Sequence, residues 1–542
     1  MLERIMLLAV LAAGFIALVL IGIVYAQAVN AQPLYSYRFE LSLDTLVSII
    51  KSAEFKSALI NTLIVALLQT IVGVLGGLIV ALAIHRVYVP YVGRLEPLVI
   101  APFFIAPVIW GFAWNYAYGP SGYIPLLKGY DPFIVGVLCG LIHVPHAYAL
   151  IASGLLSMDY SLEEVARLHG AGPLKAIVKV TIPMLRPSII LATTLLLILG
   201  FEQFGMPLVL LSPYGYDVLT TYMYGMPNRY PIDPYPKMAV VASLLLTITI
   251  SLVILQRYLA LREIRRFTTI GERYRGYYRM DVPLYIKLAL TLIVLLYVIG
   301  AVLIPLGAVF LRSVNPLYGG GLYFTVDYYR IIVGSESYRN VITNTIFVAL
   351  IAASLGSFLY LSYGWVILKG PRRAIRIYAD ILSTLPRALP GIVAGLAFLW
   401  LFLFTPLRPL MYTHLGLALA YAILWSTLGV RLIVSSLVQI SQELENVARV
   451  HGASLTRTII HIYIPLLKKS ILISWLYLFI LGIREYSVPV YLATGKTQVI
   501  GSTIVLLIGS GGLGIIAALS SITIAVSLVL TAIIFKIGWK PY

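Results

Sequence analysis

The sequence predicts an all-α polytopic membrane protein with about twelve transmembrane helices, arranged as two tandem six-helix units. Three observations support this fold class. Of the 542 residues, 60% are hydrophobic and only 11% are charged, whereas soluble domains contain about 25% charged residues. Apolar runs of roughly 20 residues recur along the chain, and each could cross a bilayer as a helix. A charged phrase also occurs twice, at 163–172 and 444–454.

The apolar runs predict the membrane spans. We expect them at about 5–26, 58–84, 97–118, 132–157, 189–211, 238–256, 284–311, 341–368, 379–404, 414–438, 471–493 and 513–535. These runs are unbroken, whereas the strands of a membrane barrel alternate between apolar and polar residues. The first run exceeds the apolar core of a signal peptide, so we interpret it as a retained anchor.

The distribution of basic residues predicts the topology. If the N-terminus lies inside, the inner segments carry 25 of the 39 lysines and arginines. Basic residues concentrate in the cytoplasmic loops of membrane proteins. We therefore expect a multi-pass protein of the plasma membrane, with both termini and both copies of the charged phrase in the cytoplasm.

A tandem repeat organises the chain. With an offset of 282 residues, 13 of 27 positions are identical between 163–189 and 445–471. The matches include charged and polar residues, which chance similarity between apolar helices would not produce. The repeat predicts a first helix with an outer loop (1–56), a first repeat domain (57–256), a basic cytoplasmic linker (257–287), the first helix and outer loop of the second half (288–339), and a second repeat domain (340–535). Acidic lipid head groups are the partners expected for the linker arginines, rather than nucleic acid.

Each copy of the phrase predicts two short helices joined by a tight turn. In the first copy, Ser161 and Glu164 have the spacing of a capping box that begins a helix. Gly170 can adopt the left-handed conformation that ends it, and Pro173 suits the first turn of the next helix. In the second copy, we expect Ser441 to cap the first helix, Gly452 to end it and Ser454 to cap the next. A single copy of this pattern could be only a helical hairpin; its repetition favours a docking element for a two-fold partner.

The pattern E-x-A-x-x-x-G followed by I-P resembles the EAA loop of type I ABC importer permeases that work with a binding protein. The residues that match in the first half are Glu164, Ala166, Gly170, Ile182 and Pro183, and those in the second half are Ala448, Gly452, Ile464 and Pro465. The pairs Asn61-Thr62 and Asn344-Thr345 are also similar to that family. The second half departs from the pattern, since Asn446 replaces the glutamate and Glu445 precedes it. We therefore expect the second contact to be weaker or differently arranged.

The resemblance implies a transport subunit without enzymatic activity. Each loop would insert into one subunit of a separate cytoplasmic ATPase dimer, and an extracytoplasmic binding protein would deliver the solute. The residues expected to couple the ATPase are Glu163, Glu164, Ala166, Gly170, Pro183, Glu445, Ala448, Gly452 and Pro465. ATP would be bound by the partner, and this chain would need no cofactor. The Gly-Lys-Thr at 495–497 lacks the first glycine of a phosphate-binding loop, because Val490 stands there.

Ionisable side chains within spans are candidates for the solute path, because they are costly in lipid. The repeat aligns Glu202 and Gln203 with Arg484 and Glu485, at equivalent depths of the two halves. Mutual neutralisation, or a water-facing position near the end of a span, is an equally good interpretation of these residues. His143 and His146 are better explained as hydrogen-bonded structural residues. No cluster of cysteine and histidine suggests a metal site.

The sequence leaves the substrate open and allows two rival functions. Within the family, the chain looks most like the iron(III), thiamine, polyamine and phosphonate importers, so we expect a small ion or charged solute. An ion-coupled secondary transporter with two parallel six-helix repeats is the main alternative. That alternative leaves the repeated cytoplasmic loop without a purpose. A membrane enzyme would need paired carboxylates or a metal cluster, which the sequence does not suggest.

Overall fold

The computed structural model describes residues 2–36, 38–267, 279–316 and 323–537, and the regular elements within these ranges are helices apart from two isolated β-bridges. Among these residues, eight helices are long and apolar enough to cross a membrane. Four pairs of bent helices raise the number of possible spans to twelve. The predicted fold class, an all-α polytopic membrane protein, is confirmed.

The chain divides into two compact units. Unit 2 comprises Ala53–Tyr222 and Ile248–Val326. Its main helices are α3 (Ala53–Ala81), α4 (Glu96–Ile100), α5 (Pro107–Tyr118), α6 (Pro132–Ser157), α7 (Ser161–Leu168), α8 (Pro173–Ala176), α9 (Ile182–Met184), α10 (Arg186–Phe201), α11 (Gly205–Leu210), α15 (Leu284–Leu296) and α16 (Ile304–Val314). Three π-helical segments join them, namely η2 (Leu82–Arg86), η5 (Ile177–Thr181) and η7 (Tyr297–Leu303).

Unit 1 comprises Met1–Ser52, Met223–Thr247 and Asp327–Trp539. Its main helices are α1 (Leu2–Ala28), α2 (Asp44–Lys51), α17 (Asp327–Gly334), α18 (Glu336–Lys369), α19 (Arg373–Thr384), α20 (Gly391–Phe404), α21 (His414–Leu424), α22 (Ser426–Leu437), α23 (Gln442–Val450), α24 (Leu455–Thr458), α25 (Ile464–Arg484), α26 (Pro489–Leu492), α27 (Ile500–Ile508) and α28 (Leu513–Lys536). The π-helical η10 (Ile459–Tyr463) precedes α25. Helix α12 (Leu219–Tyr224) and helix α14 (Pro234–Phe267) each contribute residues to both units.

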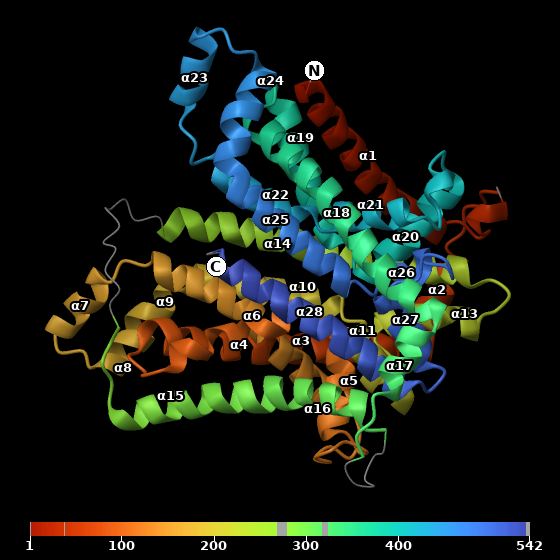
Figure 1. Ribbon diagram of the computed structural model, residues 1–542, viewed down its shortest axis with the longest axis horizontal. Helices are drawn as coiled ribbons and strands as arrows, with labels where there is room; N and C mark the ends of the chain where they lie inside the picture. The colour runs from red at the N-terminus through yellow and green to blue at the C-terminus, as the bar shows by residue number, and fades with distance from the viewer. Residues whose placement is uncertain (1, 37, 268–278, 317–322, 538–542) are drawn as a thin grey trace. The chain divides into compact units, whose positions relative to one another are not determined.

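Each unit contains the first long helix of the other sequence repeat. In unit 1, α1 packs against α18, α19 and α20 (Figure 1). The contact with α19 is close, because a Cβ atom on Gly14 would lie 2.4 Å from the Leu382 side chain. In unit 2, α16 packs against α5, and the Tyr118 hydroxyl donates to the Gly300 carbonyl of η7 at 2.8 Å. The compact units therefore differ from the sequence repeats in the placement of these first helices.

Three of the predicted spans are bent helix pairs. The segments 97–118 and 379–404 are each bent by 112°, and 414–438 is bent by 58°. The two sharp bends precede Pro107 and Pro390, where Ala106 and Leu389 adopt extended backbone conformations. A residue before proline is disfavoured in the helical conformation, which explains both breaks. Hydropathy therefore predicted these segments but not the bends within them.

The linker predicted at 257–287 begins as a helix. Helix α14 continues from its apolar part to Phe267, and residues 268–278 lie outside the described ranges. The linker ends beside η2, because the Met280 amide donates to the Arg86 carbonyl and the Tyr88 amide donates to the Met280 carbonyl, both at 2.9 Å. The end of the linker is thus fixed to the end of the second predicted span.

Candidate functional site

The two copies of the charged phrase form the same local structure. Helix α7 is followed by Gly170 with φ of +82°, and α23 is followed by Gly452 with φ of +76°. The amides of Ala171 and Ala453 donate to the carbonyls of Ala166 and Ala448, at 3.0 and 2.9 Å. This hydrogen bond and the left-handed residue before it are the Schellman ending of a helix. The predicted turns are confirmed.

The predicted caps are correct in the second copy and only partly in the first. The Ser441 and Ser454 hydroxyls accept from backbone amides at the start of α23 and α24, and Pro173 begins α8. The predicted capping box at Ser161 is wrong, because Ser161 is already the first residue of α7 and the residue before it provides no side-chain cap. Instead the Asp159 carboxylate accepts from the Ser161 amide at 2.9 Å, so an aspartate two residues earlier begins the turn.

Glu163 anchors α7 to two other segments of unit 2. Its side chain is fully buried and forms an ion pair with Arg86, the last residue of η2. The hydroxyl of Thr181, the last residue of η5, donates to the same carboxylate. The guanidinium of Arg86 also lies 4.5 Å from the centre of the Tyr160 ring. The carboxylate therefore holds the loop helix against the ends of two π-helical segments.

Glu445 anchors α23 in the same way in unit 1. Its carboxylate lies 3.0 Å from Lys369 Nζ, at the end of α18, and 2.7 Å from the guanidinium of Arg449. It also accepts from the Tyr463 hydroxyl at 2.9 Å and from Gln442 Nε2 at 3.0 Å. Burial raises the pKa of this carboxyl, but the hydrogen bonds from Lys369 and Tyr463 outweigh it, so the pKa is lowered overall. The carboxylate is therefore ionised at neutral pH.

The two anchors are equivalent under the sequence repeat. Glu163 and Thr181 align with Glu445 and Tyr463 at the offset of 282, and Arg86 aligns with Lys369 at an offset of 283. The glutamate shared by both loops is thus the buried one. Glu164, which matches the E-x-A pattern, and its counterpart Asn446 are both exposed. The sequence did not indicate Arg86 or Lys369 as partners, since nothing in the repeat relates a loop to the end of an earlier span.

Each loop helix has an exposed apolar face. In α7, Leu162, Val165 and Leu168 follow one another at a spacing of three residues and are exposed, Leu168 by 85%. The aligned residues of α23 are Leu444, Val447 and Val450, and Val450 is 84% exposed. Contiguous exposed apolar side chains mark interaction surfaces. These two apolar faces were not predicted from the sequence, although the aligned apolar positions could have indicated them.

The remaining predicted coupling residues lie near these faces. Ala166 and Ala448 are half-buried, and their carbonyls close the turns described above. Pro183 of α9 lines a groove of 360 Å³ together with Leu162 and Lys179. Pro465 occupies the corresponding position at the start of α25. Each loop helix therefore presents an apolar face, a half-buried alanine and an exposed glycine turn.

The repeated Asn-Thr pairs join α3 and α18 to a later loop and helix. Asn61 donates to the Asp217 carbonyl at 2.9 Å, and the Thr62 hydroxyl accepts from the Leu219 amide at the start of α12 at 2.8 Å. In unit 1, Asn344 donates to the carbonyls of residues 496 and 498, and Thr345 accepts from the Ile500 amide at the start of α27. The Gly-Lys-Thr segment therefore lies in a loop whose carbonyls accept from Asn344, and α27 begins at Ile500, three residues after Thr497.

The predicted path residues of the first half lie where a long helix is interrupted. Helix α10 ends at Phe201, and the short helix α11 begins at Gly205. Gln203, in this interruption, is buried and donates to Gln69 Oε1 at 2.8 Å, and its Nε2 lies 3.5 Å from His143 Nε2. Glu202 is half-buried. The structure thus places His143 beside a predicted path residue.

The predicted path residues of the second half lie in a matching interruption, between α25 and α26. Glu485 is buried and accepts from the backbone amides of Ser487 and Val488, at 2.9 and 3.2 Å. It also accepts from the Ser487 hydroxyl at 2.6 Å. Glu485 therefore caps the turn that leads into α26, while Arg484 is the last residue of α25. Such interrupted helices often line solute sites in transport proteins.

Comparison with known proteins identifies the class. A model of the family described as "binding-protein-dependent transport system inner membrane component" matches residues 5–265 and 363–537. The chain belongs to this family of ABC importer permeases, because the two matched regions cover most of its length. The two regions fall in the two halves of the repeat, as in a fused double permease. The protein is thus a multi-pass membrane protein of a transport system.

The names of individual relatives refer to different transported solutes. The ferric transport system permease protein FbpB of Actinobacillus pleuropneumoniae is 24% identical over 512 residues, which are 91% of this chain and 71% of that protein. The molybdenum transport system permease protein ModB of Mycobacterium tuberculosis is 25% identical over 247 residues, 43% of this chain and 89% of ModB. The trehalose transport system permease protein SugA of the same species is 28% identical over 147 residues, 25% of this chain and 48% of SugA.

Proposed function

We propose that this chain forms the solute path of an ABC importer and couples it to a separate cytoplasmic ATPase dimer through α7 and α23. The observation that carries the proposal is the repeated design of these helices. Each is fixed to its own unit by a buried glutamate, and each exposes an apolar face at aligned positions. A pair of equivalent, rigidly anchored faces suits a partner made of two equivalent subunits.

The proposed topology places both loop helices in the cytoplasm. Within unit 1, the N-terminal helix α1 contacts α24, the helix that follows the α23 turn. This contact supports an N-terminus on the same side of the membrane as the second loop. The distribution of basic residues favours the cytoplasm for that side. The extracytoplasmic binding protein would then contact the opposite ends of the spans.

The proposed mechanism transmits movement of the ATPase through the buried anchors. Closure of the ATPase dimer on ATP would displace α7 and α23. Because Glu163 is bound to Arg86 and Glu445 to Lys369, each displacement would reach the ends of η2 and α18. The chain itself would bind no ATP and need no cofactor. A transported metal cation would be a substrate of the chain and not a cofactor.

We propose a small charged solute as cargo, with iron(III) favoured by the similarity to FbpB across 91% of the chain. Arg484 and Glu485 in one half, and Glu202 and Gln203 in the other, are the proposed path residues. The named cargoes of relatives range from ferric iron to trehalose. The pocket of the binding protein would therefore identify the solute more directly than this chain.

An ATPase pull-down tests the proposal. We expect the wild-type chain to co-purify with its ATPase and the double variant Leu168→Glu, Val450→Glu to lose it, because both changes place charge in the apolar faces. The matched control is Leu168→Met, Val450→Ile, which changes the same two residues but keeps both faces apolar and should retain the ATPase. Undiminished pull-down of the charged variant would contradict the proposal, and uptake without any nucleotidase would favour a secondary transporter.

A further inference from the structure

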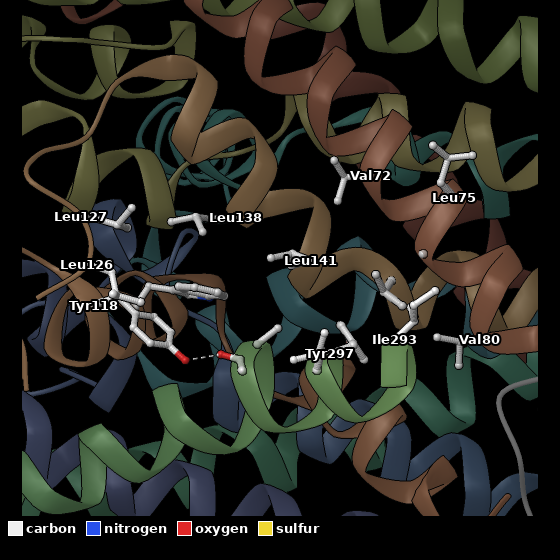
Figure 2. A pocket seen from close by; sticks show the side chains of 16 residues that line it. Val72, Leu75, Val80, Tyr118, Leu126, Leu127, Leu138, Leu141, Ile293 and Tyr297 are labelled. Atoms are coloured by element: carbon white, nitrogen blue, oxygen red, sulfur yellow. Dashed lines mark hydrogen bonds between the residues drawn. The ribbon is translucent and has the colours of Figure 1, made fainter. Parts of the chain in front are cut away.

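An apolar cavity of 640 Å³ lies within unit 2 (Figure 2). Its walls come from α3, α5, α6, the loop that follows α5, and the segment of α15 and η7. Most of the lining is aliphatic, as shown by Val72 and Val80 of α3, Leu138 and Leu141 of α6, and Ile293 of α15. The volume is within the range of roughly 300–1,000 Å³ that small-molecule sites occupy. It is therefore large enough for a single lipid chain.

The cavity opens on the side of the spanning helices. Leu75 of α3 and Leu296 of α15 line it and are 55% and 63% exposed. Both residues belong to helices that are long and apolar enough to cross a membrane. The medium at this depth is hydrocarbon rather than water. An acyl chain of the bilayer therefore has direct access to the cavity.

Two buried donors in the lining lack a partner within the described part of the chain. They are the indole Nε1 of Trp114 and the hydroxyl of Tyr297, whose side chains are only 6% and 8% exposed. The neighbouring Tyr118 differs, because its hydroxyl donates to the Gly300 carbonyl (Figure 2). A buried donor without an acceptor is costly in an apolar environment. The site therefore suits a ligand that combines an apolar chain with a hydrogen-bond acceptor.

We propose that this cavity binds a glycerophospholipid. One acyl chain would lie along the apolar lining, and an ester carbonyl would accept from Trp114 or Tyr297. Leu126 and Leu127 line the end of the cavity beside the loop, and the exposed Lys128 follows them directly. A lysine there can donate a charge-assisted hydrogen bond to the phosphate of a lipid head group. The lipid would fill the space that α3 and α6 enclose with the segment α15–η7, and so stabilise the first helix of the second repeat in its place.

Photo-labelling tests the proposal on the full chain in nanodiscs. A phospholipid with a diazirine on one acyl chain should label peptides that contain Trp114 and Tyr297. Ala301→Phe places a ring in the cavity and should lower this labelling severalfold. Leu292→Phe is the matched control, because Leu292 lies on α15, is exposed and does not line the cavity. Unchanged labelling in Ala301→Phe would mean that only surrounding bilayer lipid is labelled, and would overturn the proposal.

A second variant separates recognition from loss of space. Trp114→Phe with Tyr297→Phe keeps the apolar lining and removes both unpartnered donors. Native mass spectrometry of the wild-type chain should show a retained phospholipid, and this double variant should retain severalfold less. Both variants should elute from a size-exclusion column like the wild type, which shows that they are folded. A retained molecule of another class, such as a quinone, or equal phospholipid retention in the double variant, would contradict the proposal. Neither readout depends on the ATPase, so this test of the lipid site is independent of the proposed coupling.

Discussion

Glu163 and Glu445 are buried at equivalent positions of the two repeats, although each belongs to a short charged helix outside the apolar spans. Each carboxylate is bound by the basic residue at the end of an earlier helix, Arg86 or Lys369. A buried charge is tolerated in proteins when it is paired and hydrogen-bonded. The shared glutamate of the two loops therefore holds each loop helix against its own unit.

Glu163→Gln should destabilise the purified chain by itself. Removal of one partner from a buried ion pair costs about 3–5 kcal/mol, because the other charge is left uncompensated. The double variant Arg86→Met, Glu163→Met should be less destabilised than either single variant, since no unpaired charge remains. Thermal unfolding of the purified chain measures both effects. Glu164→Gln is the control, and an equal loss of stability there would contradict the distinction between the two glutamates.

The second anchor should depend on pH. The pKa of Glu445 is lowered in the folded chain, because the hydrogen bonds from Lys369 and Tyr463 outweigh the effect of burial. Its stabilisation is therefore fully present above the ordinary value of 4.5 and is lost as the pH falls through the lowered pKa. Wild type should melt at a higher temperature than Glu445→Gln at neutral pH. We expect this difference in melting temperature to shrink as the pH falls below 4.5 and through the lowered pKa of Glu445. A difference that stays constant with pH would contradict this.

The glycine turns should be sensitive to any side chain. Gly170 and Gly452 have positive φ, and a Cβ atom added at either would meet nothing within 4 Å, so the cost of alanine comes from the backbone alone. That cost is roughly 1–2 kcal/mol for a left-handed residue.

The loop turns should also be needed for ATPase association. Gly170→Pro or Ala166→Glu should abolish this association, and the equivalent changes at Gly452 and Ala448 should be less severe. Gly172→Ala is the control, because Gly172 has φ of −62° and open space. Equal losses from Gly172→Ala would point to a nonspecific effect.

The Asn-Thr pairs should contribute stability through helix capping. Thr62→Val removes the acceptor for the Leu219 amide and should cost about 1 kcal/mol. Thr70→Val, on the same helix, is the matched control, since the Thr70 hydroxyl donates to the Ala66 carbonyl within its own helix. A lower melting temperature for Thr62→Val than for Thr70→Val is the expected result. Equal melting temperatures would show that the cap does not matter.

Of the proposed path residues, Glu202 and Arg484 should affect uptake more than folding. We expect Glu202→Gln and Arg484→Met to impair solute uptake in cells while the protein still inserts into the membrane. Glu485→Gln should instead lower the melting temperature, because the Glu485 carboxylate caps the turn before α26. Uptake assays with membrane fractions quantified by immunoblot separate these effects. Normal uptake by both of the first two variants would remove them from the path.

Local sequence patterns predicted the loop turns, but not the partners of the loops. Glycine and serine act through their own backbone and neighbouring amides, so Gly170, Gly452 and Ser441 could be assigned from the sequence. The ion pair of Arg86 with Glu163 joins residues far apart in the sequence, and no periodicity indicates it. The bends at Pro107 and Pro390 were foreseeable from the proline itself. The exchange of α1 and α15–η7 between the units depends on tertiary packing, which the repeat alone does not reveal.

Cysteine cross-linking tests the central claim most directly. In a Cys139→Ser background, Leu168→Cys and Val450→Cys place one thiol at the exposed tip of each loop helix. Both thiols should cross-link to the ATPase in inside-out vesicles, and an impermeant maleimide applied outside intact cells should leave them unlabelled. If the external reagent modifies either thiol, or if neither thiol cross-links to the ATPase, α7 and α23 do not couple this permease to an ATPase.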